Sequence, residues 1–478
     1  EREMNKQPNI VLIVMDSVRA ANLSCCGYLR TTTPNIDQLA TQSTLFEQAI
    51  SVGCWTLPVH ASLFTGLYPL NHGMVVSKDA LPENFPTLAR RLKQHGYQTA
   101  CFSSNPYISE TTGLTQGFDT VENVWHITKA RGIERTTLSK LIMQLQRYGS
   151  LASPAIRLAR TLQHARSIAK RRRNLGDSGA KLTNERIKTW ITELRNPGTP
   201  FFIFVNYMEC HEPYNPPHPY DRRFMPKDFS SWRVARVGHG EDAVLASPEA
   251  QRKDNIEIIQ ALYDGELAYL DHKIGELMQF IETLGIMDET VVVVTSDHGD
   301  SLGEHDQVGH RMTLYEPLVH VPLIIRYPAC FQPGMRVPQQ VSLIDLYPTL
   351  LELAGAGMPE TTTNSAHSLI APPPTDARPF AVAENTAPKS LDSVIARMIR
   401  TDQYKYIWKS NQQHELYDLV NDPGELTNLV TVRPHVARSM FERLKAWERS
   451  LNGKHVEMRE AEYDEAILDR LRALGYVD

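Results

Sequence analysis

The stretch Asn9-Ile-Val-Leu-Ile-Val-Met15, followed at once by Asp16, decides the fold. After its first residue it is entirely apolar, without the alternation of a half-exposed strand. Such a run is typical of a central parallel strand that is covered on both faces. Four more segments have the same character and are predicted to be strands: residues 98–103, 201–207, 290–295 and 321–326.

Helical patterns lie between these apolar runs. One begins at Thr33-Pro34 and reaches about Thr41, a second begins at Pro58, and a third covers residues 85–94. Residues 254–284 carry apolar side chains at the 3.6-residue spacing of a helix. Strands that alternate with helices predict an α/β fold, in which a mainly parallel sheet is sandwiched by helices. Ligands of such folds bind beyond the carboxyl ends of the strands.

The last quarter of the chain has a different pattern. Residues 362–378 are rich in threonine and proline, which is typical of a linker. Beyond them we predict four short antiparallel strands and two helices, at residues 380–384, 394–400, 404–409, 415–419, 434–451 and 460–474. We therefore expect a large α/β domain over residues 1–375 and a small α+β subdomain over residues 376–478.

Composition excludes several classes of protein. The net charge of −5 over 478 residues gives no basic field for binding nucleic acid. Six cysteines without a Cys-x-x-Cys pair argue against a disulfide scaffold and a zinc ribbon. The longest apolar run, residues 10–15, is too short to cross a bilayer. Nothing at the start resembles a signal peptide, so we expect a cytoplasmic protein; a cleaved leader stays open because the chain does not begin with methionine.

One segment differs from the rest in charge. Residues 129–173 hold 12 lysines and arginines and one acidic residue, so the rest of the chain carries about −16. Apolar residues at helical spacing accompany the basic ones, which predicts an insertion of basic amphipathic helices over about residues 129–180. Such helices suit an anionic membrane surface or an acidic substrate. The alternative is that they pack on the acidic body or form a homo-oligomer contact.

Three motifs that carry chemistry stand at predicted strand ends or a helix start. They are Asp16 with Ser17, Trp55-Thr56-Leu-Pro58-Val-His60, and Ser296-Asp297-His298-Gly299. Carboxylates, a hydroxyl and an imidazole form a reasonable ligand set for a divalent metal. A metal would activate Thr56, which is a poor nucleophile as a free alcohol. Each motif alone also has a structural explanation, such as a helix cap at Thr56 before Pro58.

Together these motifs resemble the sulfatase family within the alkaline phosphatase superfamily. The resemblance runs almost end to end and includes Thr32-Thr-Pro-Asn-Ile-Asp37, Asn206-Tyr-Met-Glu-Cys-His211-Glu-Pro-Tyr214, Gly309-His310 and Glu415-Leu-Tyr-Asp-Leu-Val-Asn-Asp-Pro-Gly424. It implies an alkaline phosphatase-like fold.

The resemblance also implies roles for individual residues. The metal ligands fall on Asp16, Thr56, Asp297 and His298, and they would hold one divalent ion: Mn, Mg, Ca or Zn. The catalytic residues would be Thr56 as nucleophile, with His211 and His310 on the substrate side. Substrate-binding roles fall on three further residues: His60, Asn105 and Glu209. Glu209 would alternatively hold a second metal or orient His211. His72 and His305 are expected to be structural.

The sequence departs from the family pattern at the nucleophile. Sulfatases carry Cys-x-Pro-x-Arg, whose cysteine is oxidised to formylglycine, but here these positions hold Thr56 and His60. Cys54 lies two residues too early, so no formylglycine is expected. Ser17 stands where sulfatases have a second metal-binding aspartate. Ser104 and Pro106 replace a lysine and a histidine that bind sulfate.

These departures favour the threonine-nucleophile branches of the superfamily. We therefore expect a metal-dependent hydrolase of phosphate or phosphonate esters, similar to a phosphodiesterase, with a covalent threonyl intermediate. Three alternatives stay open: a sulfuric ester hydrolase, a transferase of a phospho group to an alcohol acceptor, and a catalytically degenerate binding protein. The substrate partner would be a phosphate or sulfate ester.

Overall fold

The computed structural model describes residues 7–127, 177–237, 249–310, 312–357, 366–370, 378–385, 394–451 and 458–473, with a few positions between 155 and 162. The predicted basic insertion and most of the predicted linker therefore lie outside the described residues. No helix in the described ranges is long and apolar enough to span a membrane. The cytoplasmic location stays a prediction.

An eight-stranded sheet forms the centre of the molecule, in the order β11-β2-β10-β7-β1-β6-β4-β5. The strands are β1 (Asn9–Met15), β2 (Thr44–Ile50), β4 (Gln98–Ser103), β5 (Thr120–Asn123), β6 (Phe201–Tyr207), β7 (Thr290–Thr295), β10 (His320–Arg326) and β11 (Met335–Ser342). β1 lies between β6 and β7 and is parallel to both. The predicted α/β fold with a mainly parallel sheet is confirmed.

The sheet contains three strands that the sequence did not indicate, β2, β5 and β11. β2 carries Glu47 and Gln48, and β11 carries Pro338, so neither is a continuous apolar run. β10 is antiparallel to both of its neighbours, β7 and β2. Its apolar run is as continuous as that of a parallel strand, because both of its faces are covered.

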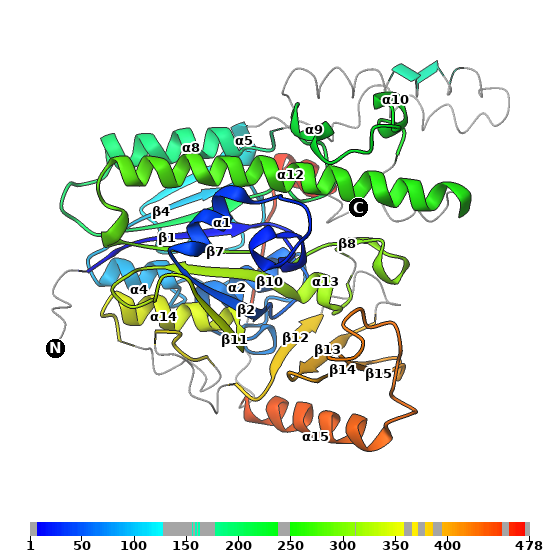
Figure 1. Ribbon diagram of the computed structural model, residues 1–478. Helices are drawn as coiled ribbons and strands as arrows, with labels where there is room; N and C mark the ends of the chain where they lie inside the picture. Colours follow the sequence, from blue (N-terminus) through cyan, green and yellow to red (C-terminus); the bar gives the residue numbers. More distant parts are fainter. Residues whose placement is uncertain are drawn as a thin grey trace.

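Helices cover both faces of this sheet (Figure 1). One face holds α1 (Pro34–Thr41), α8 (Ala180–Thr189) and the long α12 (Glu249–Thr283); the other holds α2 (Thr56–Thr65), α4 (Leu88–Gln94) and α14 (Leu346–Leu353). Successive side chains of a strand point to opposite faces. Ile10, Leu12 and Val14 of β1 therefore pack in one core, while Val11 and Ile13 pack in the other.

Short elements complete the large body. The helices are α3 (Pro69–His72), α5 (Val124–Ile127), α9 (Tyr220–Arg223), α10 (Ser231–Val234) and α13 (Glu316–Val319). Two small antiparallel pairs join β3 (Asp79–Ala80) to β16 (Arg459–Glu460) and β8 (Ser301–Leu302) to β9 (Val308–Gly309). The second pair folds the chain back after β7, which matters for the site below.

A separate four-stranded antiparallel sheet follows, as predicted. It consists of β12 (Ala381–Asn385), β13 (Ala396–Arg400), β14 (Tyr404–Lys409) and β15 (Glu415–Asp418), in chain order. The last helices are α15 (Pro434–Ser450) and α16 (Glu465–Ala473). The boundary near residue 375 stays a prediction.

The small sheet is joined to the large body close to the start of α2. The backbone N–H of Glu384 on β12 donates to the carbonyl of Val52 at 2.9 Å. Glu384 also forms a parallel bridge with Gly53. Its carboxylate accepts from the backbone N–H of Leu70 at 3.1 Å. The loop that leads into α2 is therefore held by both parts of the molecule.

Candidate active site

The predicted metal ligands meet at the carboxyl ends of two adjacent strands. Asp16 follows β1, and Asp297 and His298 follow β7. In the parallel pairing of these strands Val14 lies beside Thr295, so the residues after each strand end are neighbours. The ligand atoms of Asp16, Asp297 and His298 all lie within 4.8 Å of one another, and all three residues are fully buried.

The donor atoms of this group fit a cation. Oδ2 of Asp297 and Nε2 of His298 are buried without a hydrogen-bond partner among the described residues, and they lie 3.5 Å apart. Nδ1 of His298 lies 2.8 Å from the carbonyl oxygen of Gly299, which turns Nε2 toward the carboxylates. Oδ1 of Asp297 accepts from the backbone N–H groups of Ser17 and His298, which leaves Oδ2 to face the ligand atoms of Asp16 and His298.

The electrostatics lead to the same conclusion. Burial, together with the neighbouring Asp16 carboxylate, raises the pKa of Asp297 to about 8. Burial also raises the pKa of Asp16, but His211, His298 and the amide of Asn105 outweigh it and leave that pKa below its usual range. Burial lowers the pKa of His298, which keeps the imidazole neutral, as a ligand must be. Two buried carboxylates this close repel each other unless a cation lies between them.

Asn105 links the nucleophile candidate to this group. Its Nδ2 donates to Oδ2 of Asp16 at 2.9 Å and lies 3.4 Å from Oγ1 of Thr56. Its own Oδ1 accepts from the backbone N–H of Tyr107, which fixes the amide in this orientation. Thr56 is the first residue of α2, where the N–H groups at the helix start favour an anion. The Thr56 hydroxyl and the Asp16 carboxylate therefore flank one amide nitrogen.

Two further imidazoles stand beside the metal candidates. The ring centres of His310 and His298 are 5.0 Å apart, and those of His310 and His211 are 4.8 Å apart. Nδ1 of His211 lies 2.7 Å from the carbonyl of Glu212, which fixes its ring. The structure thus gathers the residues expected to bind metal and to act in catalysis, although they come from strands far apart in sequence.

His60 is fully buried beside this cluster. Its ring packs edge-on against Phe64 and Phe204. Its Nδ1 lies 2.9 Å from the carbonyl of Thr56 and 3.6 Å from Oδ2 of Asp297. The substrate contact expected from the sequence stays a prediction.

Glu209 is likewise buried. Its Oε1 accepts from the backbone N–H of Ala180 at 2.8 Å. Burial, together with the nearby Asp177, raises its pKa to about 8. A carboxyl group held neutral in this way suits the orienting role better than a second metal site.

Two residues of the cluster were given no role by the sequence analysis. Asp300 directly follows the motif Ser296-Asp297-His298-Gly299, and Tyr214 ends the motif that begins at Asn206. The Tyr214 hydroxyl donates to Oδ2 of Asp300, and Oδ1 of Asp300 lies 3.9 Å from Nδ1 of His310. The signal in the sequence was their position within or next to motifs that supplied candidate site residues.

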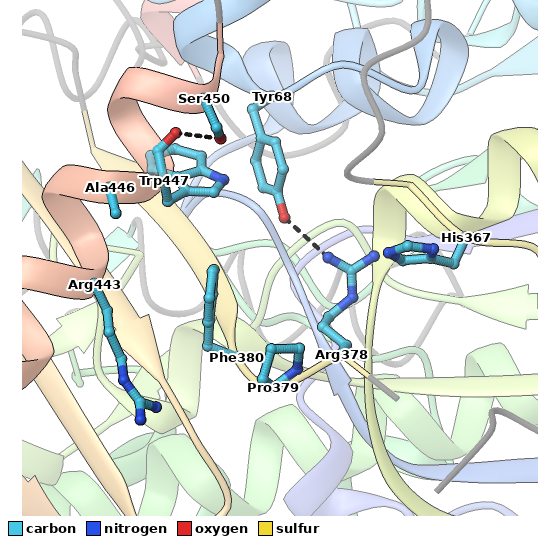
Figure 2. A pocket seen from close by; sticks show the side chains of 9 residues that line it. All are labelled: Tyr68, His367, Arg378, Pro379, Phe380, Arg443, Ala446, Trp447 and Ser450. Carbon is cyan, nitrogen blue, oxygen red and sulfur yellow. Dashed lines mark hydrogen bonds between the residues drawn. The ribbon is translucent and has the colours of Figure 1, made fainter. Parts of the chain in front are cut away.

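A cavity of about 370 Å³ lies away from this cluster, where residues of α15 face Tyr68 and residues 378–380 (Figure 2). Its walls include Tyr68, Phe380 and Trp447, and its most buried cation is Arg378. The guanidinium of Arg378 pairs with Asp345 and donates to the hydroxyl of Tyr68. No carboxylate–imidazole group lines this cavity, which therefore lacks the donor set of the cluster around Asp16.

Comparison with known proteins gives consistent matches over the chain. The family model described as Sulfatase matches residues 8–356, and the model described as N-sulphoglucosamine sulphohydrolase, C-terminal, matches residues 303–450. An arylsulfatase of Clostridium perfringens is 26% identical over 452 residues, which cover 90% of this chain and 92% of the relative.

Solved structures show the same fold. A phosphonate monoester hydrolase of Agrobacterium radiobacter aligns with a TM-score of 0.72 and 23% identity, over 93% of this chain and 96% of that one. A protein solved in complex with its substrate, D-glucosamine-2-N,6-O-disulfate, aligns with a TM-score of 0.70 and 19% identity, over 94% and 99% of the two chains. The alignments extend over almost the whole length of both partners.

Proposed function

The chain belongs to the sulfatase family of ester hydrolases, and on that premise we propose that it hydrolyses phosphate or phosphonate esters through a covalent intermediate on Thr56. The observation that carries this proposal is the placement of Thr56 at a helix start, beside a buried Asp16–Asp297–His298 group. Asn105 connects the two by its amide nitrogen.

Asp16, Asp297, His298 and the Thr56 hydroxyl would hold one divalent cation. When bound there, the cation would favour the ionised form of the Thr56 hydroxyl and offset negative charge on the ester. Carboxylate oxygens suit Mg²⁺, Mn²⁺ or Ca²⁺, and the imidazole also permits Zn²⁺.

The residues of the chain then divide the reaction between them. Oγ1 of Thr56, its proton already lost, attacks phosphorus while the bond to the leaving oxygen breaks, and the departing oxygen takes a proton from His211 or His310. The amide of Asn105 and the N–H groups at the start of α2 stabilise the charge that develops on the nonbridging oxygens. Water then releases the phosphoryl group from Thr56, and a histidine accepts its proton.

The charges of the site favour an ester with a single negative charge. The ionisable groups that lower the pKa of Asp16 most are the imidazoles of His211 and His298, not a lysine or an arginine. Arg19, which lies close by, is paired with Glu304 at 2.7 Å. Two carboxylates and one divalent cation leave little positive charge for a dianionic phosphate monoester. Phosphodiesters, phosphonate monoesters and sulfate monoesters are monoanions and fit this balance.

Sulfate ester hydrolysis is the second candidate. It is favoured by the arylsulfatase relative, whose sequence this chain matches over 92% of its length. Against it stands the threonine at position 56, since the family's sulfatases use a formylglycine made from cysteine at that position. Sulfate and phosphodiester also share the charge that the site accepts, so the nucleophile is the feature that separates the two functions.

A panel of aryl esters tests the proposal. A phosphodiester, a phosphonate monoester, a phosphate monoester and a sulfate monoester with one leaving group would be compared on metal-loaded protein. We expect the first two to be hydrolysed fastest. A dominant sulfatase activity would replace the proposal by the second candidate.

The nucleophile is tested on the same panel. Thr56→Ala should abolish turnover, Thr56→Ser should retain part of it, and Thr41→Ala on the exposed end of α1 should have no effect. Mass spectrometry of quenched protein should find the phosphoryl adduct on the peptide that contains Thr56. Full activity of Thr56→Ala would contradict the covalent route.

A further inference from the structure

A buried carboxylate stands behind the imidazole of His310. Oδ1 of Asp300 lies 3.9 Å from Nδ1 of His310, and Asp300 is fully buried. Its other oxygen, Oδ2, accepts the hydroxyl proton of Tyr214, which is also fully buried. Oδ1 itself has no hydrogen-bond partner among the described residues. An acceptor that is buried and unpaired costs free energy, so it indicates a donor that arrives in another state of the protein.

The chain connection explains why Asp300 faces His310 rather than a neighbour in sequence. Asp300 is followed by β8, and β9 returns the chain antiparallel to it, with Ser301 beside Gly309. The residues just before β8 and just after β9, Asp300 and His310, therefore lie side by side. Gly309 has a φ of +88°, and a Cβ there would lie 2.8 Å from Oε2 of Glu212, so the turn into His310 requires glycine.

Resting on the proposed function, we infer that Asp300 is a positioning residue for His310, held in place by Tyr214. Oδ1 of Asp300 accepts the Nδ1–H of His310, and this bond directs Nε2 toward the leaving oxygen of the ester. The two atoms need to approach by about 1 Å, which is common because catalytic hydrogen bonds are often long before substrate binds. A carboxylate behind a histidine fixes its tautomer and orientation in the same way at metal sites.

The surroundings give Asp300 no equally good alternative donor. The guanidinium of Arg19 donates to the backbone carbonyl of Asp300 at 3.3 Å, not to its carboxylate. Glu212 also acts on Asp300, but as a second negative group. Tyr214 satisfies Oδ2 only, and its ring packs edge-on against Tyr263. Of the described neighbours, His310 is the one whose nitrogen faces Oδ1.

The leaving-group dependence of the reaction tests this role. Esters with the same transferred group and either a nitrophenol or a phenol leaving group differ in their need for a proton donor. Asp300→Ala should slow the phenol ester about 10-fold more than the nitrophenol ester, since proton donation contributes about 10²- to 10⁴-fold. Asp300→Asn, which retains an acceptor oxygen, should recover part of the loss. Tyr214→Phe, which removes one hydroxyl from a buried ring, should have a smaller effect with the same preference.

A double-mutant cycle with His310 separates positioning from a general loss of structure. In the His310→Ala background, Asp300→Ala should add no further loss, because the residue through which Asp300 acts is gone. Equal losses on both esters, or fully additive losses in the cycle, would overturn the inference. Metal content and thermal unfolding of each variant identify any that fail to fold, and Tyr214→Phe then supplies the readout.

A measurement without substrate keeps this inference apart from the proposed function. Nitrogen NMR on protein labelled at histidine reports which ring nitrogen of His310 carries the proton, with His310→Gln as the assignment control. We expect Nδ1 of His310 to carry a proton in the wild type, whether or not Nε2 also carries one, and this Nδ1 proton to be lost in Asp300→Ala. A wild type that hydrolyses no ester but carries the Nδ1 proton would refute the proposed function alone. A wild type in which Nδ1 of His310 carries no proton would refute the role of Asp300.

Discussion

Nδ2 of Asn105 donates to Oδ2 of Asp16 at 2.9 Å, although the two residues are 89 positions apart in the chain. Asn105 comes two residues after the end of β4, and Asp16 directly follows β1. β6 lies between these two strands and is parallel to both, so their carboxyl ends open on the same edge of the sheet. The bond therefore ties two sides of the site together through one amide.

We predict that Asn105→Ala lowers kcat/KM by about 100-fold, which is the cost of losing one donor at a developing negative charge. The substitution also frees Oδ2 of Asp16 and the Thr56 hydroxyl from their shared neighbour. Steady-state kinetics on the preferred ester would measure the loss. Asn411→Ala, on an exposed turn, is the matched control and should have no effect. Activity of Asn105→Ala within a factor of two of wild type would refute this role.

One substitution in the Asp16–Asp297–His298 group should act in opposite directions on the stability of the metal-free protein and on metal binding. Asp297→Asn removes one of two adjacent buried carboxylates, so the metal-free variant should be at least as stable as the metal-free wild type. Metal at 100 times its Kd should stabilise the wild type by about 2.7 kcal/mol and the variant by far less. Thermal unfolding with and without chelator measures both effects, and Asp402→Asn on the surface is the control. Equal stabilisation of wild type and Asp297→Asn would exclude Asp297 as a ligand.

Strands that are buried on both faces were predictable from the sequence because nothing polar interrupts them. The predicted ranges of β1, β4, β6 and β7 agree with the structure. The direction of β10 was not predictable, because its apolar run is the same whichever way it lies. β2 was missed since Glu47 and Gln48 are partly exposed and break the apolar run.

For the site, the sequence indicated which residues take part but not how their side chains are arranged. The motifs indicated Asp16, Thr56, Asp297 and His298, which the structure brings together around one point. The motif did not indicate that His60 contacts a ligand, and the structure places its Nδ1 3.6 Å from Oδ2 of Asp297. The predicted substrate contact of His60 stays a prediction. The approach of Asp300 to His310 depends on the β8–β9 hairpin, and no spacing rule in the sequence gives that distance.

Most of the basic segment 129–173 lies outside the described residues, and its role stays a prediction from sequence. Each lysine or arginine near an anionic bilayer contributes about 1 kcal/mol, so replacing residues 170–173 by glutamine should weaken vesicle binding at least 10-fold. Sedimentation with phosphatidylserine vesicles would measure binding, with phosphatidylcholine vesicles as the control. Binding should weaken at high salt. A salt-insensitive dimer that binds neither vesicle, and that separates when residues 129–173 are deleted, would assign the segment to assembly.

A buried ionic network joins the small sheet to the large body. The side chain of Lys405 is fully buried, 3.2 Å from Oε1 of Glu316 and 2.8 Å from Oε1 of Glu425. Lys405→Ala should lower the free energy of unfolding by about 3–5 kcal/mol, because it leaves Glu425 buried without a cation. Lys405→Met combined with Glu425→Gln should recover most of that loss. Urea unfolding measures the stability of both variants. The control Arg438→Ala, which removes an exposed ion pair with Glu442, should change stability by less than about 0.5 kcal/mol. A loss below about 0.5 kcal/mol in Lys405→Ala would show that the network contributes little.

Glu209 predicts a dependence of stability on pH. Burial and the nearby Asp177 raise its folded-state pKa to about 8, well above the usual value for a glutamate in the unfolded chain. The fold therefore favours the protonated carboxyl, and this contribution is fully present below about pH 4.5 and lost as pH rises through 8. Glu209→Gln mimics the protonated form and keeps an oxygen for the backbone N–H of Ala180. The variant should match the wild type near pH 4 and exceed its stability by more than about 1 kcal/mol near pH 8. Urea unfolding at both pH values measures the difference, and Glu193→Gln on the surface is the control. If the difference in stability between the variant and the wild type is the same at both pH values, Glu209 is ionised in the folded protein. The orienting role, which was argued from a neutral carboxyl, would then be refuted.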